Sequence, residues 1–126
     1  MLSADSINSH YYIKSYAEGV FYILQNQPEK AEIVKNNTFF ISNEKIEDFN
    51  QIDSFADLTI EMIKEFDGID ILIIGSGEKQ LFPDKQFLSQ LSSLNFSVEF
   101  MNNAAASRTF NVLVNDERKV AAIFFV

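Results

Sequence analysis

The chain has 126 residues, 47% of them hydrophobic, which suits one domain over residues 1–126 with its own core and excludes an intrinsically disordered protein. Its formal net charge of −8 argues against generic binding to nucleic acids or anionic membranes, because such binding depends on lysine and arginine. The sequence has no cysteine, so a disulfide framework, a thiolate nucleophile and a zinc–thiolate site are excluded.

The first third of the chain contains four short runs rich in β-branched and aromatic residues, a composition typical of strands. Gly19 precedes the second run, and residues 26–28 (Asn-Gln-Pro) predict a turn after it. Asn36 and Asn37 separate the third and fourth runs and predict a hairpin turn between them. The four predicted strands span residues 11–16, 20–24, 31–35 and 38–42.

A loop and then a helix are predicted in the middle of the chain. Residues 44–54 are polar and acidic, which is typical of a loop. Residues 56–66 follow with the periodicity of an amphipathic helix, and Gly68 ends it because glycine is favoured just past a helix. The apolar stripe of this helix consists of Leu58, Met62, Ile63 and Phe66.

The next part of the chain predicts a β-α-β unit. Residues 69–74 are almost continuously apolar, as in a strand buried on both faces. Pro83 and Asp84 open a helix, since proline and acidic residues are favoured in the first turn. Residues 96–101 alternate in polarity like a second strand. The two strands should therefore be parallel, with a right-handed crossover.

One further helix and one further strand are predicted at the C-terminal end. Asn102 and Asn103 can cap a helix over residues 104–112, and residues 120–126 are apolar enough for a buried strand. No apolar run approaches the length of a membrane span, and the first residues lack the features of a signal peptide. We therefore expect a soluble protein of the bacterial cytoplasm.

Two polar loops fall at the carboxyl ends of the predicted parallel strands, where open α/β sheets bind their ligands. One is the glycine turn after residue 74. The other leads into a helix N-terminus, whose free N–H groups favour an anion, and Arg108 could add a bidentate donor. We predict a ligand or partner surface, suited to a small carboxylate or phosphate, at Gly75, Ser76, Gly77, Gln80, Asn102, Ser107, Arg108, Thr109 and Asn111.

The same residues also have a purely structural interpretation. The two glycines can simply form a tight strand-to-helix turn. Gln80 stands where a dinucleotide-binding fingerprint needs glycine, and the lysine-serine or lysine-threonine ending of a phosphate-binding loop is missing. Arg108 can pair with an acid such as Glu78 or Glu99 rather than with a ligand.

No complete set of catalytic groups is visible. His10 is the only histidine, and neither Ser76 nor Ser107 has a base nearby in the sequence. The acidic residues between 44 and 57 are spread out and most simply form a solvated face. We therefore predict no catalytic residue, no metal site and no cofactor, and favour a non-enzymatic role.

Two segments resemble a known family. They are DILIIGSGEKQLFPDKQFLSQL at residues 70–91 and FSVEFMNNAAASRTFNVLVNDERKVAAIFFV at residues 96–126. The first carries a Gly-Ser-Gly turn followed by glutamine and proline, and the second carries the run AASRTFN. On these motifs the chain is similar to the Mth938-like domain family, which includes a mitochondrial assembly factor of respiratory complex I and an adipogenesis-associated homologue.

The resemblance implies a three-layer α/β fold with a central mixed sheet whose last strand is antiparallel to the rest, to which the N-terminal half adds a β-hairpin region. It implies no established enzymatic activity. For eukaryotic members it implies a role in building respiratory complex I through protein–protein contacts. We therefore expect protein partners, no nucleic acid and no membrane insertion.

This sequence departs from the family pattern at three places. Ser107 stands where many relatives have cysteine, Phe110 replaces a frequent tyrosine, and a tryptophan often found after the N-terminal strands is missing. Three hypotheses remain open: an interaction or assembly factor, a binder of a small anion or an undetected enzyme that uses the loop 75–80 and Arg108, and motif residues with structural roles alone.

Overall fold

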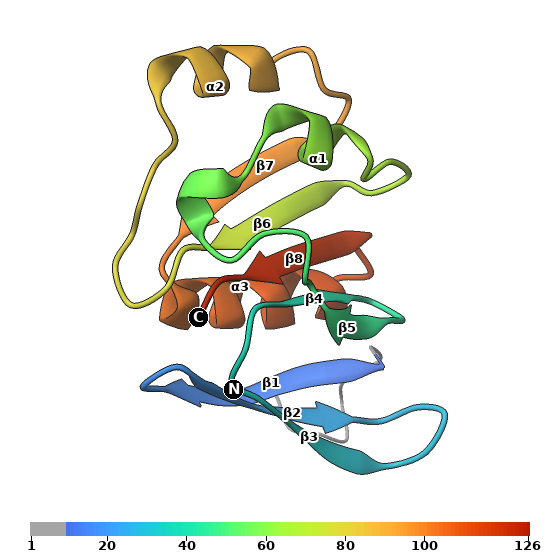
Figure 1. Ribbon diagram of the computed structural model, residues 1–126. Helices are drawn as coiled ribbons and strands as arrows, with labels where there is room; N and C mark the ends of the chain where they lie inside the picture. Colours follow the sequence, from blue (N-terminus) through green and yellow to red (C-terminus); the bar gives the residue numbers. More distant parts are fainter. Residues whose placement is uncertain (1–9) are drawn as a thin grey trace.

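The computed structural model describes residues 10–126, which form two β-sheets and the helices packed against them (Figure 1). The prediction that no targeting segment is present depends on residues 1–9 and lies outside the described residues. The smaller sheet is antiparallel, in the order β1-β2-β3, and the larger sheet has the order β5-β4-β8-β6-β7. The strands are β1 (Tyr11–Ala17), β2 (Val20–Gln25), β3 (Ala31–Lys35), β4 (Phe39–Ser42), β5 (Ile46–Asp48), β6 (Ile71–Gly75), β7 (Ser97–Met101) and β8 (Val120–Phe124).

The larger sheet is the middle of three layers. One of its faces packs against the long helix α3 (Asn103–Asn115) and the smaller sheet, and the opposite face is covered by the short 3-10 helix η2 (Phe55–Asp57), α1 (Ile60–Lys64) and α2 (Lys85–Leu91) (Figure 1). Successive residues of β6 enter opposite cores, as the alternation of a strand requires. The predicted three-layer α/β fold with a mixed central sheet is confirmed.

The prediction that the last strand runs antiparallel to the rest is wrong. β8 is parallel to β6, with Ile73 opposite Ala122, and it is antiparallel to β4. The physical reason is the connection that precedes β8. Helix α3 returns the chain along the sheet after β7, and strands joined through such a helical crossover run in the same direction. The strand that is antiparallel to its neighbours is β4.

The predicted hairpin turn at Asn36-Asn37 is also wrong. β3 pairs with β2, whereas β4 pairs with β5 and β8, so these two asparagines carry the chain from one sheet to the other. Phe39 of β4 explains the choice of partner. Its ring is fully buried, stacks on Phe124 of β8 with 5.2 Å between the centroids, and meets Phe21 of β2 edge-on at 4.9 Å.

The segment predicted as a loop over residues 44–54 contains the edge strand β5. The backbone N–H of Ser42 donates to the carbonyl of Lys45 at 2.8 Å and closes a tight β4–β5 hairpin. Only Ile46 of this strand is partly buried, and the next two residues are exposed acids. β5 therefore has almost no apolar pattern, and its formation depends on hydrogen bonds to β4.

The helix predicted over residues 56–66 is broken into η2 and α1. Leu58 has an extended backbone between them and buries its side chain in the core. Thr59 then starts a new helix, because its hydroxyl oxygen accepts the N–H of Met62 at 3.3 Å as an N-cap. The sequence did not predict that a helix begins at this point, because the apolar stripe continues across the break.

The remaining predicted elements are present with small changes at their ends. All five residues of β6 are buried, as a strand covered on both faces requires. Asp84 caps α2 by accepting the N–H of Phe87 at 2.8 Å, and Asn102 caps α3 by accepting the N–H of Ala105 at 2.9 Å. Helix α3 runs three residues further than expected, to Asn115.

Candidate functional site

The two polar loops predicted at the carboxyl ends of β6 and β7 meet and form one unit. The backbone N–H of Ser76 donates to the carbonyl of Met101 at 2.9 Å. The N–H of Asn103 donates to the carbonyl of Gly77 at 2.8 Å. The glycine turn and the start of α3 are therefore held together by backbone hydrogen bonds that extend the pairing of the two strands.

Asn103 is the residue that locks this unit to the C-terminal strand. Its side chain is fully buried, and its Oδ1 accepts the N–H of Gly77 at 3.0 Å while its Nδ2 donates to the carbonyl of Phe125 at 2.8 Å. The sequence indicated Asn103 only as part of a helix cap. Its amide instead satisfies the backbone of two separate segments inside the protein.

The polar side chains of the glycine turn are also used within the chain. Ser76 Oγ donates to the carbonyl of Lys79 at 2.7 Å and accepts the N–H of Leu81 at 3.0 Å. Gln80 Nε2 donates to the carbonyl of Phe100 at 3.0 Å. These bonds give the turn its shape, which supports a structural role for its polar side chains over direct contact with a ligand.

The two polar residues on the inner side of α3 hold the helix itself and strand β1. Ser107 Oγ donates to the carbonyl of Asn103 at 2.8 Å. Asn111 makes a paired contact with Ile13, accepting its N–H and donating to its carbonyl, both at 2.9 Å. The pairing of β1 with β2 shifts by one residue directly after Ile13. Asn111 thus clips the edge of β1 to the helix at this irregularity.

Arg108 differs from the other predicted site residues. It is exposed, and within residues 10–126 it makes no ion pair, either with the predicted partners Glu78 and Glu99 or with another acid. Together with Lys14 of β1 it lines a groove of about 300 Å³ between that strand and α3. Ser107 and Asn111 also line this groove. The other predicted site residues do not: Gly75, Ser76, Gly77, Gln80, Asn102 and Thr109.

Tyr16 of β1 connects the smaller sheet to the glycine turn. Its hydroxyl donates to Glu78 Oε1 at 2.5 Å, and its ring packs on Phe21 with 4.5 Å between the centroids. Burial raises the pKa of the Tyr16 hydroxyl above its ordinary value, and the hydrogen bond to the carboxylate raises it further, because both disfavour the phenolate.

The raised pKa of Tyr16 predicts a loss of stability in alkaline solution. A tyrosine whose pKa is higher in the folded state stabilises the fold below its unfolded pKa of about 10, and this contribution disappears as the pH rises through the folded value. The free energy of unfolding of the Tyr16→Phe variant should therefore fall less steeply above pH ~10 than that of the wild type. Urea titrations at a series of pH values measure the difference, and identical slopes would contradict it.

An apolar surface that was not predicted from the sequence lies directly after the glycine turn. Leu81 and Phe82 are 44% and 62% exposed. They border a hollow of about 300 Å³ whose other walls come from η2, the start of α2 and the residues between them: Phe55, Ala56, Leu58, Pro83, Asp84 and Phe87. The sequence feature that could have indicated this surface is an apolar pair in an otherwise polar loop, because neither residue belongs to a helix or strand that could bury it.

Residues 13–125 match the model of a family described as protein of unknown function (DUF498/DUF598). The chain belongs to this family. A curated relative from Francisella tularensis, named 13 kDa major membrane protein, is 31% identical over 123 residues, which is 97% of this chain and 96% of that protein. The DUF498 match spans both loops of the candidate site.

Solved structures with the same fold confirm the suspected resemblance. A crystal structure from Bordetella parapertussis has a TM-score of 0.76 at 20% identity, covering 94% of this chain and 97% of that one. An NMR structure of a Mth938-like domain from Bordetella pertussis has a TM-score of 0.69 at 19% identity, covering 99% and 91%. The crystal structure of an outer membrane protein from Bartonella henselae matches with a TM-score of 0.69 at 25% identity, covering 95% and 98%.

The described residues of this DUF498 chain were compared with the requirements of a membrane-spanning helix and of a metal site. Within the part of the chain that the structure describes, no helix is long and apolar enough to cross a membrane. Over the same residues, no three histidine or carboxylate side chains are grouped closely enough to hold a metal ion.

Proposed function

We propose that this DUF498-family protein is a non-enzymatic interaction factor that docks a protein partner on the apolar surface of Leu81 and Phe82. The exposure of these two side chains is the observation that carries the proposal. Full burial of a large apolar side chain contributes roughly 1.5–3 kcal/mol, and a partner can supply the part of it that these half-exposed side chains lack. The neighbouring hollow can receive an apolar side chain in return.

The geometry of the glycine turn supports this role over catalysis. Its serine and glutamine are engaged with backbone groups, so the turn presents Leu81 and Phe82 from a stiff base. A pre-shaped loop loses little conformational entropy when it binds, and phenylalanine is among the residue types enriched at protein interfaces. In this proposal the protein acts in the bacterial cytoplasm and assists the assembly of a larger complex. Respiratory complex I is the complex to test first, because of the family resemblance.

The test is an affinity purification after crosslinking in the native host, using wild-type protein and the double variant Leu81→Asp with Phe82→Asp. We expect a partner to be recovered with the wild type and its yield to fall at least about tenfold with the double variant, since truncation of hot-spot residues costs ~2 kcal/mol or more. Val34→Asp with Val112→Asp is the matched control, because both valines are 54% exposed and the pair adds the same charge on β3 and α3.

Two results would contradict the proposal. One is equal recovery of the partner with the wild type and the double variant. The other is recovery of no partner from cells in which deletion of the gene also leaves every respiratory complex at its normal level on native gels. Circular dichroism of the double variant should match the wild type, because both side chains are exposed.

A second candidate function is the binding of a small anion in the groove between β1 and α3. The observation that favours it is the presence of two cations, Lys14 and Arg108, that form no ion pair within residues 10–126 and share one groove of about 300 Å³. A thermal-shift screen of carboxylates and phosphates tests it, because a ligand at 100 times its Kd stabilises the fold by about 2.7 kcal/mol. Arg108→Ala should abolish a hit, whereas Arg118→Ala, at the remote contact with Asp70, should not.

A further inference from the structure

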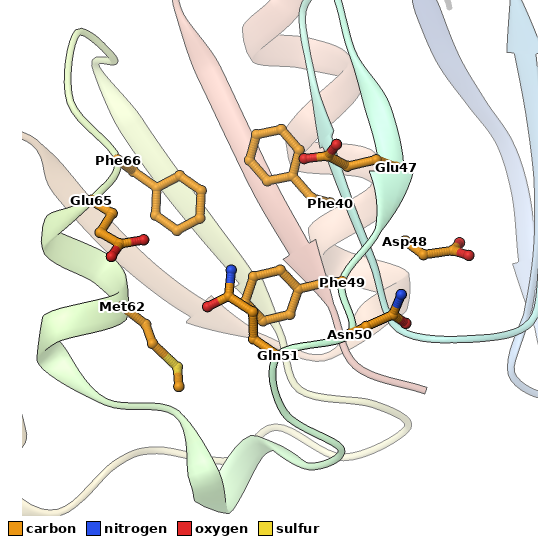
Figure 2. A pocket seen from close by; sticks show the side chains of 9 residues that line it. All are labelled: Phe40, Glu47, Asp48, Phe49, Asn50, Gln51, Met62, Glu65 and Phe66. Carbon is orange, nitrogen blue, oxygen red and sulfur yellow. The ribbon is translucent and has the colours of Figure 1, made fainter.

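A hollow larger than the one beside Leu81 and Phe82 or the groove at Arg108 lies beside the β4–β5 hairpin, and it shares no lining residue with either of them. It has a volume of about 530 Å³, within the range of small-molecule sites. Its walls come from the hairpin, from the chain that follows it and from α1 (Figure 2). The residues that line it are Phe40, Glu47, Asp48, Phe49, Asn50, Gln51, Met62, Glu65 and Phe66.

The inner wall of this hollow is apolar and aromatic. Phe40 and Phe66 stack face to face, with 5.4 Å between their centroids and 8° between their planes. Phe49 is buried at 7% exposure, and Met62 is partly buried beside it. Figure 2 shows these four side chains on the hairpin and α1 sides of the same space. The wall therefore favours an apolar ligand body and disfavours a fully hydrated metal ion.

The rim of the hollow is negative. Glu47 and Glu65 are exposed carboxylates, and no lysine or arginine is among the lining residues. Glu65 makes no ion pair within residues 10–126 and follows the last turn of α1, where the helix carbonyls add partial negative charge. Asp48 points away toward the smaller sheet, where Lys35 Nζ lies 2.7 Å from its Oδ1 (Figure 2). An anionic ligand is thus disfavoured.

The chain itself already places an ammonium group at this rim. Lys45 Nζ lies 3.1 Å from Glu47 Oε1 and 5.9 Å from the centroid of the Phe40 ring. Both partners of this ion pair are more than half exposed, so the lysine holds its place weakly and can be displaced. The contact uses Glu47, one of the two rim carboxylates, and it shows this carboxylate and the ring of Phe40 together accepting a cation.

We propose that this hollow is a binding site for an organic cation, a primary ammonium or guanidinium group carried on an apolar body. The apolar body lies against Phe49, Met62 and the edge of the stacked rings. The cationic group lies at the rim between Glu47 and Glu65. The same chemistry can come from a free amine or from a basic side chain next to an apolar residue in a peptide.

The experiment is an NMR titration of the full chain, followed at the Met62 methyl group and at the backbone amides of residues 47–51. The probes are 4-phenylbutylamine, 4-phenylbutanol and 5-phenylvalerate, which share the phenylbutyl group as their apolar body and differ in charge. We expect saturable shifts with the amine at millimolar concentration or below, much weaker shifts with the alcohol and none with the acid. High salt should weaken the binding of the amine.

Two charge-matched double variants separate the rim carboxylates from the overall charge. Glu47→Gln with Glu65→Gln should raise the Kd for phenylbutylamine about tenfold, because hydrogen bonds to charged groups are lost. Glu29→Gln with Glu32→Gln removes two exposed acids near and within β3 and should leave the Kd within about twofold. Both variants keep the apolar wall and have the same net charge. A difference between their Kd values for phenylbutylamine is therefore due to the two rim carboxylates.

The outcomes are distinguishable. Equal binding of amine and alcohol, absence of saturable shifts with the amine, or an unchanged Kd in the rim variant would each overturn the proposal. If N-acetyl-phenylalanyl-lysine amide binds more tightly than phenylbutylamine, the site takes a basic side chain of a peptide. If it binds less tightly, the site takes a free amine. Loss of partner recovery in the Leu81 and Phe82 variant bears on the other surface and leaves this result unaffected.

Discussion

Replacing Gly75 with alanine should lower the free energy of unfolding by about 3 kcal/mol, because the added methyl group has no room. A Cβ atom at this position would lie 2.5 Å from Asn103 Oδ1 and 2.7 Å from Cδ1 of Phe124. Both neighbours are fully buried, and the asparagine is held by two hydrogen bonds. Neither can move without opening the core or breaking a bond. Urea denaturation followed by circular dichroism measures the change.

Gly68→Ala is the control for the loss of glycine itself. Gly68 has a φ of +72°, and no atom lies within 4 Å of the position that an added methyl group would take, so this variant experiences backbone strain without a collision. It should lose about 1 kcal/mol, the cost of placing a Cβ in the left-handed region. If Gly75→Ala is at least as stable as Gly68→Ala, the close approach of the strand end to Asn103 and Phe124 does not constrain the fold.

Replacing Asn103 with alanine should also cost about 3 kcal/mol. The change leaves the N–H of Gly77 and the carbonyl of Phe125 without their partner in a buried place, and each unsatisfied group costs ~1–3 kcal/mol. Asn102→Ala is a suitable control, since it removes a neighbouring amide that only caps α3 and should cost about 1 kcal/mol. Chemical denaturation compares the two variants directly, and equal losses would contradict the bridging role.

The stability losses caused by Gly75→Ala and Asn103→Ala should not be additive. Asn103→Ala removes the atom with which the new methyl group at Gly75 collides most closely. The double variant should therefore be more stable than the sum of the single losses predicts, by at least ~0.5 kcal/mol, as expected for residues in contact. Strict additivity would indicate that Phe124 alone opposes the methyl group.

The sequence located the candidate loops but not the contacts made by their side chains. The glycine turn and the asparagine pair were identified from local patterns, and Asn102 caps α3 as predicted. The partners of the other polar groups are far away along the chain. Asn111 binds Ile13 across 98 residues, and Asn103 binds Phe125 across 22. No spacing pattern encodes such contacts, because each depends on the assembled fold.

The surfaces that support the proposals were not predicted for the same reason. Lys14 joins Arg108 in one groove only because β1 packs against α3, and the hollow proposed to bind an organic cation needs the β4–β5 hairpin beside α1. The exposed pair Leu81 and Phe82 was readable as apolar from the sequence, but its exposure was not. An apolar residue in a loop can be buried or exposed, and only the surrounding elements decide which.

By itself the sequence determined the order and type of most elements, the double burial of β6 and the caps that start α2 and α3, because each of these depends on residues within a few positions of one another. The tertiary structure alone decided that β8 lies between β4 and β6, that β4 leaves β3 to pair with β8, and that a polar segment becomes the edge strand β5. Strand pairing joins backbone groups that every residue carries, so the choice of partner depends on which distant side chains can share a core.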